Sequence, residues 1–384
     1  MSDSAKRRAR DRISRLTRQG LDLVTFWEAA SAALAPAVPH YLSPCWYTLD
    51  PASLLVTAHH QRGLLEIPSD WFVHEYYEDD VHKLAEVARS DRGLSTVHDA
   101  TGGEPSRSPA WNRFVRPLGG DQELLVALRA RGGAVWGVLA LYREPGTPLF
   151  DDAELGFLQD VAPFLADGAR RCLLLGEAID PEGPEAPGLV VLREDWTVDS
   201  LSPGVTRWLA ELPDGDWERR GKLPGAVLTV AARALALAET AGVPGEVAFA
   251  RVLTRDGRWL VLHGAELVAN GSRRVSVIIQ LAHPARIAPL LMDAYGLTER
   301  EQDVTCLVLQ GNSTAEIATR LVVSALTVQQ HLKSVFDKTG VRSRRELVGK
   351  VFFSHYEPRV RDNEHRAIDG RPLRGGPAAH PATM

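Results

Sequence analysis

Cysteine is scarce in this sequence, which has 384 residues and only three cysteines. Cys45, Cys172 and Cys306 are too far apart for the ligand spacing of a zinc site, and their odd number argues against a disulfide scaffold. We therefore expect a reducing compartment. For each thiol a buried apolar role is expected rather than a redox-sensing one, because free cysteine commonly behaves as a small hydrophobic residue.

Long hydrophobic runs are missing as well. No segment reaches the run of about 18 apolar residues that a membrane span requires. The basic residues between Lys6 and Arg10 could begin a signal peptide, but charged residues as far as Glu28 interrupt every apolar stretch behind them. The sequence therefore predicts a cytoplasmic protein without a membrane partner.

The sequence also lacks a recognisable set of catalytic or metal-binding residues. It contains no G-x-x-x-x-G-K-[ST] loop for nucleotide phosphates. Three pairs lack metal-ligand partners at helical or hairpin spacing: Asp79-Asp80, Asp151-Asp152 and His59-His60. Lone histidines such as His74 and His82 are usually structural. We expect no catalytic residue, no metal and no cofactor, and hence no enzyme; an unrecognised enzymatic activity in the N-terminal half is an alternative.

Apolar residues, by contrast, occur in ordinary amounts. Hydrophobic residues make up 45% of the chain and charged residues 24%, as in a globular protein of two or three compact units. The net charge is −5, but residues 325–350 hold six basic and two acidic residues. Such a local basic segment suits contact with DNA at one place. A solvated helix surface is the alternative interpretation.

The first three quarters of the chain show short strand-like runs interrupted by helical segments. The first expected hairpin pairs Cys45–Leu49 with Leu54–Ala58, and the second pairs Leu124–Arg129 with Ala134–Tyr142. A long helix is expected from Asp151 to about residue 177. An acidic stretch rich in proline and glycine at 180–188 predicts a linker. A second unit comes next, with helices at roughly 203–240 and later strands at Val247–Thr254, Arg258–Leu267 and Arg274–Ala282.

Local capping chemistry predicts four helices after Gly296. Three capping boxes begin the first, second and fourth of them: Thr298 with Glu301, Ser313 with Glu316, and Ser343 with Glu346. Ser324 is expected to cap the third helix, which reaches about Lys338. A short helix, a tight turn and a longer helix form a helix-turn-helix.

The third of these helices has two contrasting faces. A buried stripe recurs at helical spacing: Val328, Leu332, Val335 and Phe336. Gln329, Gln330 and Lys333 lie on the opposite face, where amides can pair with adenine and an ammonium with guanine, so we assign them as base contacts. The candidate phosphate contacts are Thr314, Ser324, Thr327, His331, Lys338 and Arg342. A small helical bundle that binds no DNA is the alternative.

Together these motifs resemble the LuxR-type helix-turn-helix over about 55 residues. The resemblance rests on Leu297-Thr-Glu-Arg-Glu, Gly311, Glu316-Ile317-Ala318, Ser324, Thr327-Val328, His331 and Lys338-Thr-Gly-Val-Arg-Ser-Arg344. It implies that Gln329, Gln330 and Lys333 face bases. It also implies that the fourth helix pairs two subunits through Leu347, Val348, Val351 and Phe352. Thr305-Cys306 and Val322-Val323 depart from the usual pattern, as does a glutamine pair where lysine is common at one position.

The N-terminal half resembles two sensor folds. Gly137–Tyr142 and Phe150–Leu155 resemble parts of a GAF domain over residues 20–177. Less specifically, residues 188–282 resemble a PAS domain through Leu189–Leu192, the helix of Trp208 and the segment Arg255–Trp259. Both folds imply a small-molecule site between sheet and helices. The candidate pocket residues are Trp46, Trp71, Phe72, Tyr76 and Trp111.

The expected protein is an α+β multidomain regulator with GAF-like and PAS-like α/β sensor domains before an all-α, four-helix LuxR-type domain. Its expected parts are a basic flexible N-terminus (1–19), the GAF-like domain (20–177), a linker (178–187), the PAS-like domain (188–282), a linker (283–291), the DNA-binding domain (292–353) and a disordered tail (357–384). We expect a homodimer on double-stranded DNA, with a small-molecule effector and RNA polymerase as candidate partners. A ligand-free dimerisation or protein-interaction scaffold is the alternative for the N-terminal half.

Overall fold

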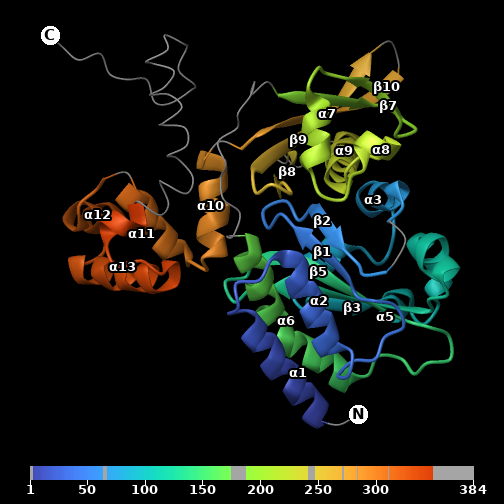
Figure 1. The fold of residues 1–384 in the computed structure, drawn as a ribbon, viewed down its shortest axis with the longest axis horizontal. Helices are drawn as coiled ribbons and strands as arrows, with labels where there is room; N and C mark the ends of the chain where they lie inside the picture. The colour runs from blue at the N-terminus through green and yellow to red at the C-terminus, as the bar shows by residue number, and fades with distance from the viewer. Residues whose placement is uncertain are drawn as a thin grey trace. The chain divides into compact units, whose positions relative to one another are not determined.

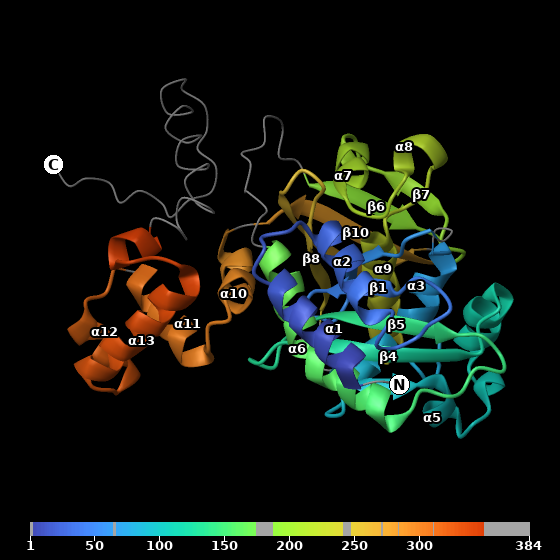
Figure 2. The ribbon, with the colours of Figure 1, turned by 60° about the horizontal axis from the view of Figure 1, so that its bottom comes forward.

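The computed structural model describes residues 3–63, 67–173, 187–240, 247–269, 272–282, 284–309 and 311–348. The described residues form two compact units, an N-terminal unit that ends at Ala282 and a C-terminal unit that comes after it in the chain (Figures 1 and 2). We call residues 3–173 the first lobe of the N-terminal unit and residues 187–282 its second lobe. Among the described residues, no helix is long and apolar enough to cross a membrane.

The first lobe is built on a five-stranded antiparallel sheet in the order β2-β1-β5-β4-β3. Its strands are β1 (Cys45–Leu49), β2 (Val56–His60), β3 (Leu94–Thr96), β4 (Gln122–Arg129) and β5 (Val135–Arg143). Both hairpins predicted from the sequence are present, with β2 starting two residues later than expected. Every residue of β1 is buried, because helices and loops cover both faces of the sheet.

Three helices pack together on one side of this sheet: α1 (Asp3–Leu16), α2 (Leu23–Leu34) and α6 (Asp152–Leu173) (Figure 1). The expectation of a flexible N-terminus at residues 1–19 is wrong for α1. Ala9, Ile13 and Leu16 recur at i, i+4 and i+7 and are buried, while the arginines between them are exposed. The helix is therefore part of the core.

Shorter elements cover the other side and one end of the first lobe. They are α3 (Ser69–Tyr76), α4 (Leu84–Arg89), α5 (Val97–Thr101) and the helical turns η1 (Pro105–Arg107), η2 (Trp111–Val115) and η3 (Arg116–Leu118). Helix α3 packs against a helix of the second lobe as well, so it belongs to the contact between the lobes.

The second lobe repeats the strand order of the first in a sheet ordered β7-β6-β10-β9-β8. Its strands are β6 (Gly188–Leu192), β7 (Val198–Leu201), β8 (Ala248–Leu253), β9 (Trp259–Ala269) and β10 (Ser272–Leu281). Its helices are α7 (Val205–Glu211), α8 (Trp217–Arg220) and α9 (Gly225–Glu239). A turn at Asp256-Gly257 joins β8 to β9, with Gly257 in the left-handed region at φ 85°.

The two lobes share one continuous hydrophobic core, which includes buried residues of β1, α3, α4, α9 and both sheets. Helices α3 and α9 approach closely because Gly225 has no side chain; a Cβ there would lie 2.5 Å from the ring of Phe72. A buried ion pair joins the lobes as well. Arg251 donates to both carboxylate oxygens of Asp50, at 2.8 and 2.6 Å, and its backbone N–H donates to the same carboxylate.

The C-terminal unit begins with α10 (Pro284–Ala294), which is succeeded by α11 (Glu299–Leu309), α12 (Thr314–Leu321) and α13 (Ala325–Thr339). The prediction of a linker at 283–291 is wrong, because Ile287, Leu290 and Leu291 are buried on α10. Residues 344–348 are helical at the start of the expected fourth helix. The expected linker at 178–187 lies almost wholly outside the described residues, and the expected tail at 357–384 lies entirely outside them.

Candidate DNA-binding surface and ligand cavity

Side-chain caps fix the geometry of the α12–turn–α13 segment. Ser313 and Glu316 form the predicted capping box, with the Glu316 N–H donating to Ser313 and the Ser313 N–H donating to the Glu316 carboxylate. Val322 ends α12 in the left-handed conformation at φ 55°. Ser324 then caps α13 by accepting the N–H of Thr327 at 3.0 Å. The turn and the start of α13 are thus set by local hydrogen bonds.

Helix α13 has the two faces predicted for it. Val328, Leu332 and Val335 are buried in the core of the C-terminal unit, and Phe336 packs against it. The base-contact candidates Gln329, Gln330 and Lys333 are all exposed. These three residues form a polar stripe that no other part of the unit covers. It lies on the part of the helix that enters the major groove in helix-turn-helix proteins.

Leu326 belongs to the same stripe, and the sequence prediction of base contacts omitted it. It precedes Gln329, Gln330 and Lys333 by three, four and seven positions, which puts all four on one helix face. Its side chain is 65% exposed although it is apolar. The helical spacing could have revealed it, but the choice of polar residues alone excluded it.

Lys338 is placed differently from the other phosphate-contact candidates. Its ammonium donates to Glu301 Oε2 at 2.6 Å, and Ser334 donates to the other oxygen of the same carboxylate. Burial alone would raise the pKa of Glu301, but the hydrogen bonds from Lys338, Ser334 and the Thr298 backbone outweigh it and hold that pKa below 4.5. Lys338 thus already pairs α13 with α11.

The remaining phosphate-contact candidates lie around the polar stripe. Ser324 and Arg342 are exposed, whereas Thr314, Thr327 and His331 are partly buried. The hydroxyls of Ser324 and Thr327 lie 2.8 Å apart within the cap of α13. These five residues keep their candidate role as phosphate contacts.

The start of the expected fourth helix is capped by Ser343, which accepts the N–H of Glu346 at 3.1 Å. Leu347 is fully buried in the core of the C-terminal unit, so it has no surface to offer a second subunit. Val348 is partly buried beside that core. Val351 and Phe352 lie outside the described residues.

A cavity of about 270 Å³ lies in the first lobe, beside the sheet and α3. Tyr47, Glu123 and Tyr142 line it from β1, β4 and β5, and Trp71 and Phe114 line it from α3 and η2. Trp71 stacks on Tyr47 with ring centroids 5.0 Å apart. Burial raises the pKa of both tyrosines well above the usual value, so both phenols stay neutral. The cavity therefore combines aromatic faces with phenol and carboxylate groups.

Of the five predicted pocket residues, Trp71 lines this cavity and the other four have core or structural positions. Trp46 is fully buried on the opposite face of the sheet, stacked on Trp27 at 4.4 Å. Phe72 packs in the core against α9. The Tyr76 hydroxyl bridges the backbone of the β1–β2 turn, and the Trp111 indole donates to the carbonyl of Asp121.

The lone histidines His74 and His82 have partners for both ring nitrogens. His74 lies 2.8 Å from the carboxylates of Glu78 and Asp80, and His82 contacts Glu123 and the Ser95 carbonyl. Within the described ranges no group of three or more potential ligand side chains could hold a metal ion.

The cysteines are poorly suited to thiolate chemistry. Burial raises the pKa of Cys45 and of Cys172 to about 12, and it raises the pKa of Cys306 as well. A redox sensor needs a thiol that ionises near neutral pH. Cys45 is buried as expected, whereas Cys172 and Cys306 are only partly buried.

Comparison with known families identifies two domains in the chain. Residues 296–351 match the family described as bacterial regulatory proteins, luxR family, and residues 16–167 match the GAF domain. The chain therefore contains a LuxR-type helix-turn-helix domain and a GAF domain. The helix-turn-helix match includes the whole α11–α13 segment and the base-contact candidates.

Two curated relatives are similar to this chain over a short segment. A protein of Mycobacterium bovis named as an HTH-type transcriptional regulator is 52% identical over 55 residues, which are 14% of this chain and 6% of that protein. The HTH-type transcriptional regulator MalT of Serratia proteamaculans is 38% identical over 68 residues, or 18% of this chain and 7% of that protein. The chain thus covers only a small part of each relative.

One solved structure that is similar to part of this chain is the phycoerythrobilin-bound GAF domain of a cyanobacterial phytochrome. It is 16% identical, and the match covers 44% of this chain and 97% of that domain, with a TM-score of 0.32.

Proposed function

We propose that this protein is a transcription regulator that binds a DNA operator through α13. The proposal rests on one observation above all: Gln329, Gln330 and Lys333 form an exposed stripe on α13 directly opposite its buried stripe. Amide and ammonium groups in this arrangement suit the hydrogen-bonding edges of adenine and guanine. The luxR-family match over residues 296–351 includes this helix, and relatives named as transcriptional regulators are similar over a segment of comparable length, which supports the same role.

The first-lobe cavity is proposed to receive the signal. Its aromatic walls suit a flat small molecule, and the neutral phenols of Tyr47 and Tyr142 and the carboxylate of Glu123 suit a ligand with its own hydrogen-bonding groups. A ligand changes DNA affinity only by as much as it distinguishes between binding-competent and incompetent arrangements. Coupling of about 1–3 kcal/mol is typical for such regulation.

The finer assignments extend this proposal. The second lobe is proposed to be PAS-like, which its five-stranded antiparallel sheet and the resemblance in its sequence support. We propose a cytoplasmic homodimer, with Val348 at or near the subunit contact and half-sites about 10 bp apart. RNA polymerase is the proposed protein partner at a promoter.

The test of DNA recognition uses the full chain and a random duplex library. Repeated selection should enrich one sequence, and the Gln330→Ala protein should bind that sequence more weakly than the wild type does. Arg92→Gln is a matched control, because Arg92 is an exposed residue of the first lobe. Failure to enrich any sequence would remove the proposed function.

The test of ligand sensing uses the same purified full chain. Small molecules extracted from it after denaturation are identified by mass spectrometry and added back to the selected DNA complex. We expect a compound that changes DNA affinity in the wild type and has no effect in the Phe114→Ala protein. If no compound changes the affinity, the N-terminal unit acts as a ligand-free scaffold.

A further inference from the structure

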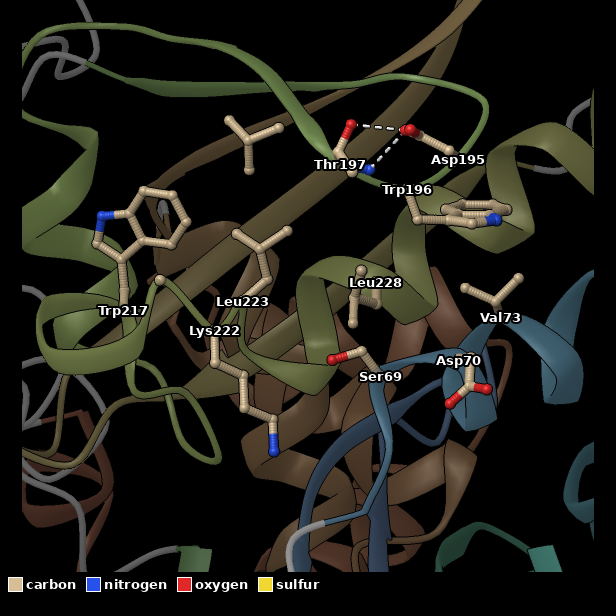
Figure 3. Close-up of a pocket in the computed structure, with 12 residues that line it drawn as sticks. Ser69, Asp70, Val73, Asp195, Trp196, Thr197, Trp217, Lys222, Leu223 and Leu228 are labelled. Atoms are coloured by element: carbon tan, nitrogen blue, oxygen red, sulfur yellow. Dashed lines mark hydrogen bonds between the residues drawn. The ribbon is translucent and has the colours of Figure 1, made fainter.

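A second cavity, of about 470 Å³, lies where the two lobes of the N-terminal unit meet (Figure 3). Helix α3 of the first lobe forms one wall, with Asp70 and Val73 among its lining residues. The β6–β7 turn, α8 and the start of α9 in the second lobe form the others. This volume is within the range of small-molecule sites, which is roughly 300–1,000 Å³.

Two tryptophans lie at opposite ends of this junction cavity. In Figure 3, Trp217 and Trp196 lie on either side of Leu223 and Leu228. Both indoles are partly exposed and pack against the hydrophobic core, and the Trp196 ring meets that of Tyr77 edge-to-face, with centroids 5.8 Å apart. The cavity therefore has an apolar floor with an aromatic ring at each end.

Trp196 occupies a turn position whose backbone conformation favours glycine. Trp196 is in the left-handed conformation, at φ 64°, in the turn between β6 and β7. Glycine is the usual residue at such a turn position, and an L-residue costs about 1–2 kcal/mol there. Local hydrogen bonds hold the turn without the indole: the Trp196 N–H donates to the Arg193 carbonyl, and Asp195 accepts from Thr197. The turn itself therefore gives no reason for tryptophan.

The charged residues around the cavity already have partners. Asp70 pairs with Arg113 at 2.6 Å, Asp195 accepts from Thr197, and the Lys222 ammonium lies 3.4 Å from the carbonyl of Ile67. All three groups thus have a polar partner within the protein, which for Asp70 is a counter-charge. The remaining lining is dominated by indole and aliphatic side chains, which favours an uncharged ligand.

We propose that the junction cavity is a second binding site, for an uncharged aromatic small molecule held between Trp196 and Trp217. This site is separate from the first-lobe cavity. Helix α3 contributes to both, with Trp71 in the first cavity and Val73 in the second. The proposal does not depend on DNA binding, so it stands or falls separately from the function proposed above.

The probe is N-phenyl-1-naphthylamine, an uncharged aromatic dye that becomes fluorescent in apolar sites. It is titrated into the full-length protein, and energy transfer from tryptophan to the dye is recorded. We expect saturable binding that weakens about tenfold in Trp196→Gly and in Trp217→Ala, since an aromatic contact and its buried area are lost. Arg92→Gln is the matched control, because Arg92 is exposed and lines neither cavity, and it should bind the dye like the wild type. Phe114→Ala reports separately on dye that binds in the first cavity.

Thermal unfolding distinguishes a ligand contact from a structural one. Glycine suits the left-handed turn, so Trp196→Gly should melt close to the wild type while it loses dye affinity. If Trp196→Gly instead has a much lower melting temperature, the Trp217→Ala protein provides the test. Weaker dye binding by Trp217→Ala supports the site, and unchanged dye binding overturns it. The proposal is also overturned if the dye does not bind saturably, or if only Phe114→Ala weakens it.

Discussion

The ammonium of Lys338 and the carboxylate of Glu301 lie 2.6 Å apart and tie the end of α13 to the start of α11. This contact gives Lys338 a structural partner within the C-terminal unit. Arg342, by comparison, has an exposed side chain and keeps its candidate role at a DNA phosphate. The two basic residues should therefore differ in what their removal affects.

We expect Lys338→Met to destabilise the C-terminal unit by about 1–3 kcal/mol, because the carboxylate of Glu301 loses the ammonium group that donates a hydrogen bond to it. Hydrogen exchange of the α11 and α13 peptides in the full chain measures this. Arg342→Gln is the comparison: it should leave exchange unchanged and reduce the slope of log affinity against log salt by about 1. A reduced salt slope in Lys338→Met would show that Lys338 contacts phosphate after all.

The lowered pKa of Glu301 predicts a pH dependence. A carboxyl group whose pKa is lower in the folded state stabilises the fold above its unfolded pKa, near 4.5, and loses that contribution as pH falls through the folded pKa. The stability difference between wild type and Glu301→Gln should therefore be largest near neutral pH and shrink below pH 4.5. Hydrogen exchange of α11 at a series of pH values, corrected for the intrinsic rate, tests this. A difference that grows on acidification contradicts it.

Base recognition should depend on Gln330 and Lys333. Alanine at either position should weaken binding to the selected operator by about 1–3 kcal/mol while affecting non-specific DNA less, because these side chains lie on the exposed stripe of α13. Titration against selected and scrambled duplexes separates the two effects. Equal losses on both duplexes would assign these residues to the phosphate backbone.

Leu326 should add a thymine preference at the same surface. An exposed apolar side chain on the reading face can contact the C5-methyl group of thymine. Replacing single thymines of the operator by deoxyuridine should weaken wild-type binding at one position, and Leu326→Ala should be insensitive to that replacement. If the methyl group matters equally to both proteins, another residue reads it.

The buried pair of Asp50 and Arg251 should be essential to the stability of the N-terminal unit. Asp50→Asn leaves a buried guanidinium without its counter-charge, which should cost about 3–5 kcal/mol. All nine tryptophans precede residue 260, so denaturation monitored by their fluorescence reports on this unit. Arg92→Gln breaks an exposed pair with Asp99 and should cost under about 1 kcal/mol. Equal effects would mean that the inter-lobe pair is not desolvated.

Periodicity and capping were sufficient to predict much of the fold. The β4–β5 hairpin is explained by two short apolar runs and α13 by helical spacing, and the Ser313–Glu316 box marks the start of α12 as predicted. Prolines at 284 and 289 favoured a linker where α10 forms. Pro284 lies in the first turn, where proline is compatible with a helix, whereas Pro289 lies inside α10 and cannot donate a backbone hydrogen bond there. The buried residues that stabilise α10 are recognisable only when its tertiary neighbours are known.

The ligand cavity was harder to predict for a specific reason. Trp46 and Tyr47 are adjacent on β1 and point to opposite faces of the sheet. Both faces are covered, so both residues are buried and alternation cannot tell the cavity side from the helix side. A prediction based on large aromatic side chains alone therefore included Trp46, which packs on Trp27, and omitted Tyr47, which lines the cavity.

The shared core of the two lobes limits how this protein can be recombined with others. A chimera that kept only the first lobe would present the apolar side of α3, including Phe72, to water, and a contiguous apolar patch of that kind promotes aggregation. A chimera that kept only the second lobe would leave Arg251 without its ion-pair partner Asp50. The smallest part that can be transplanted is therefore the pair of lobes together, which ends at Ala282.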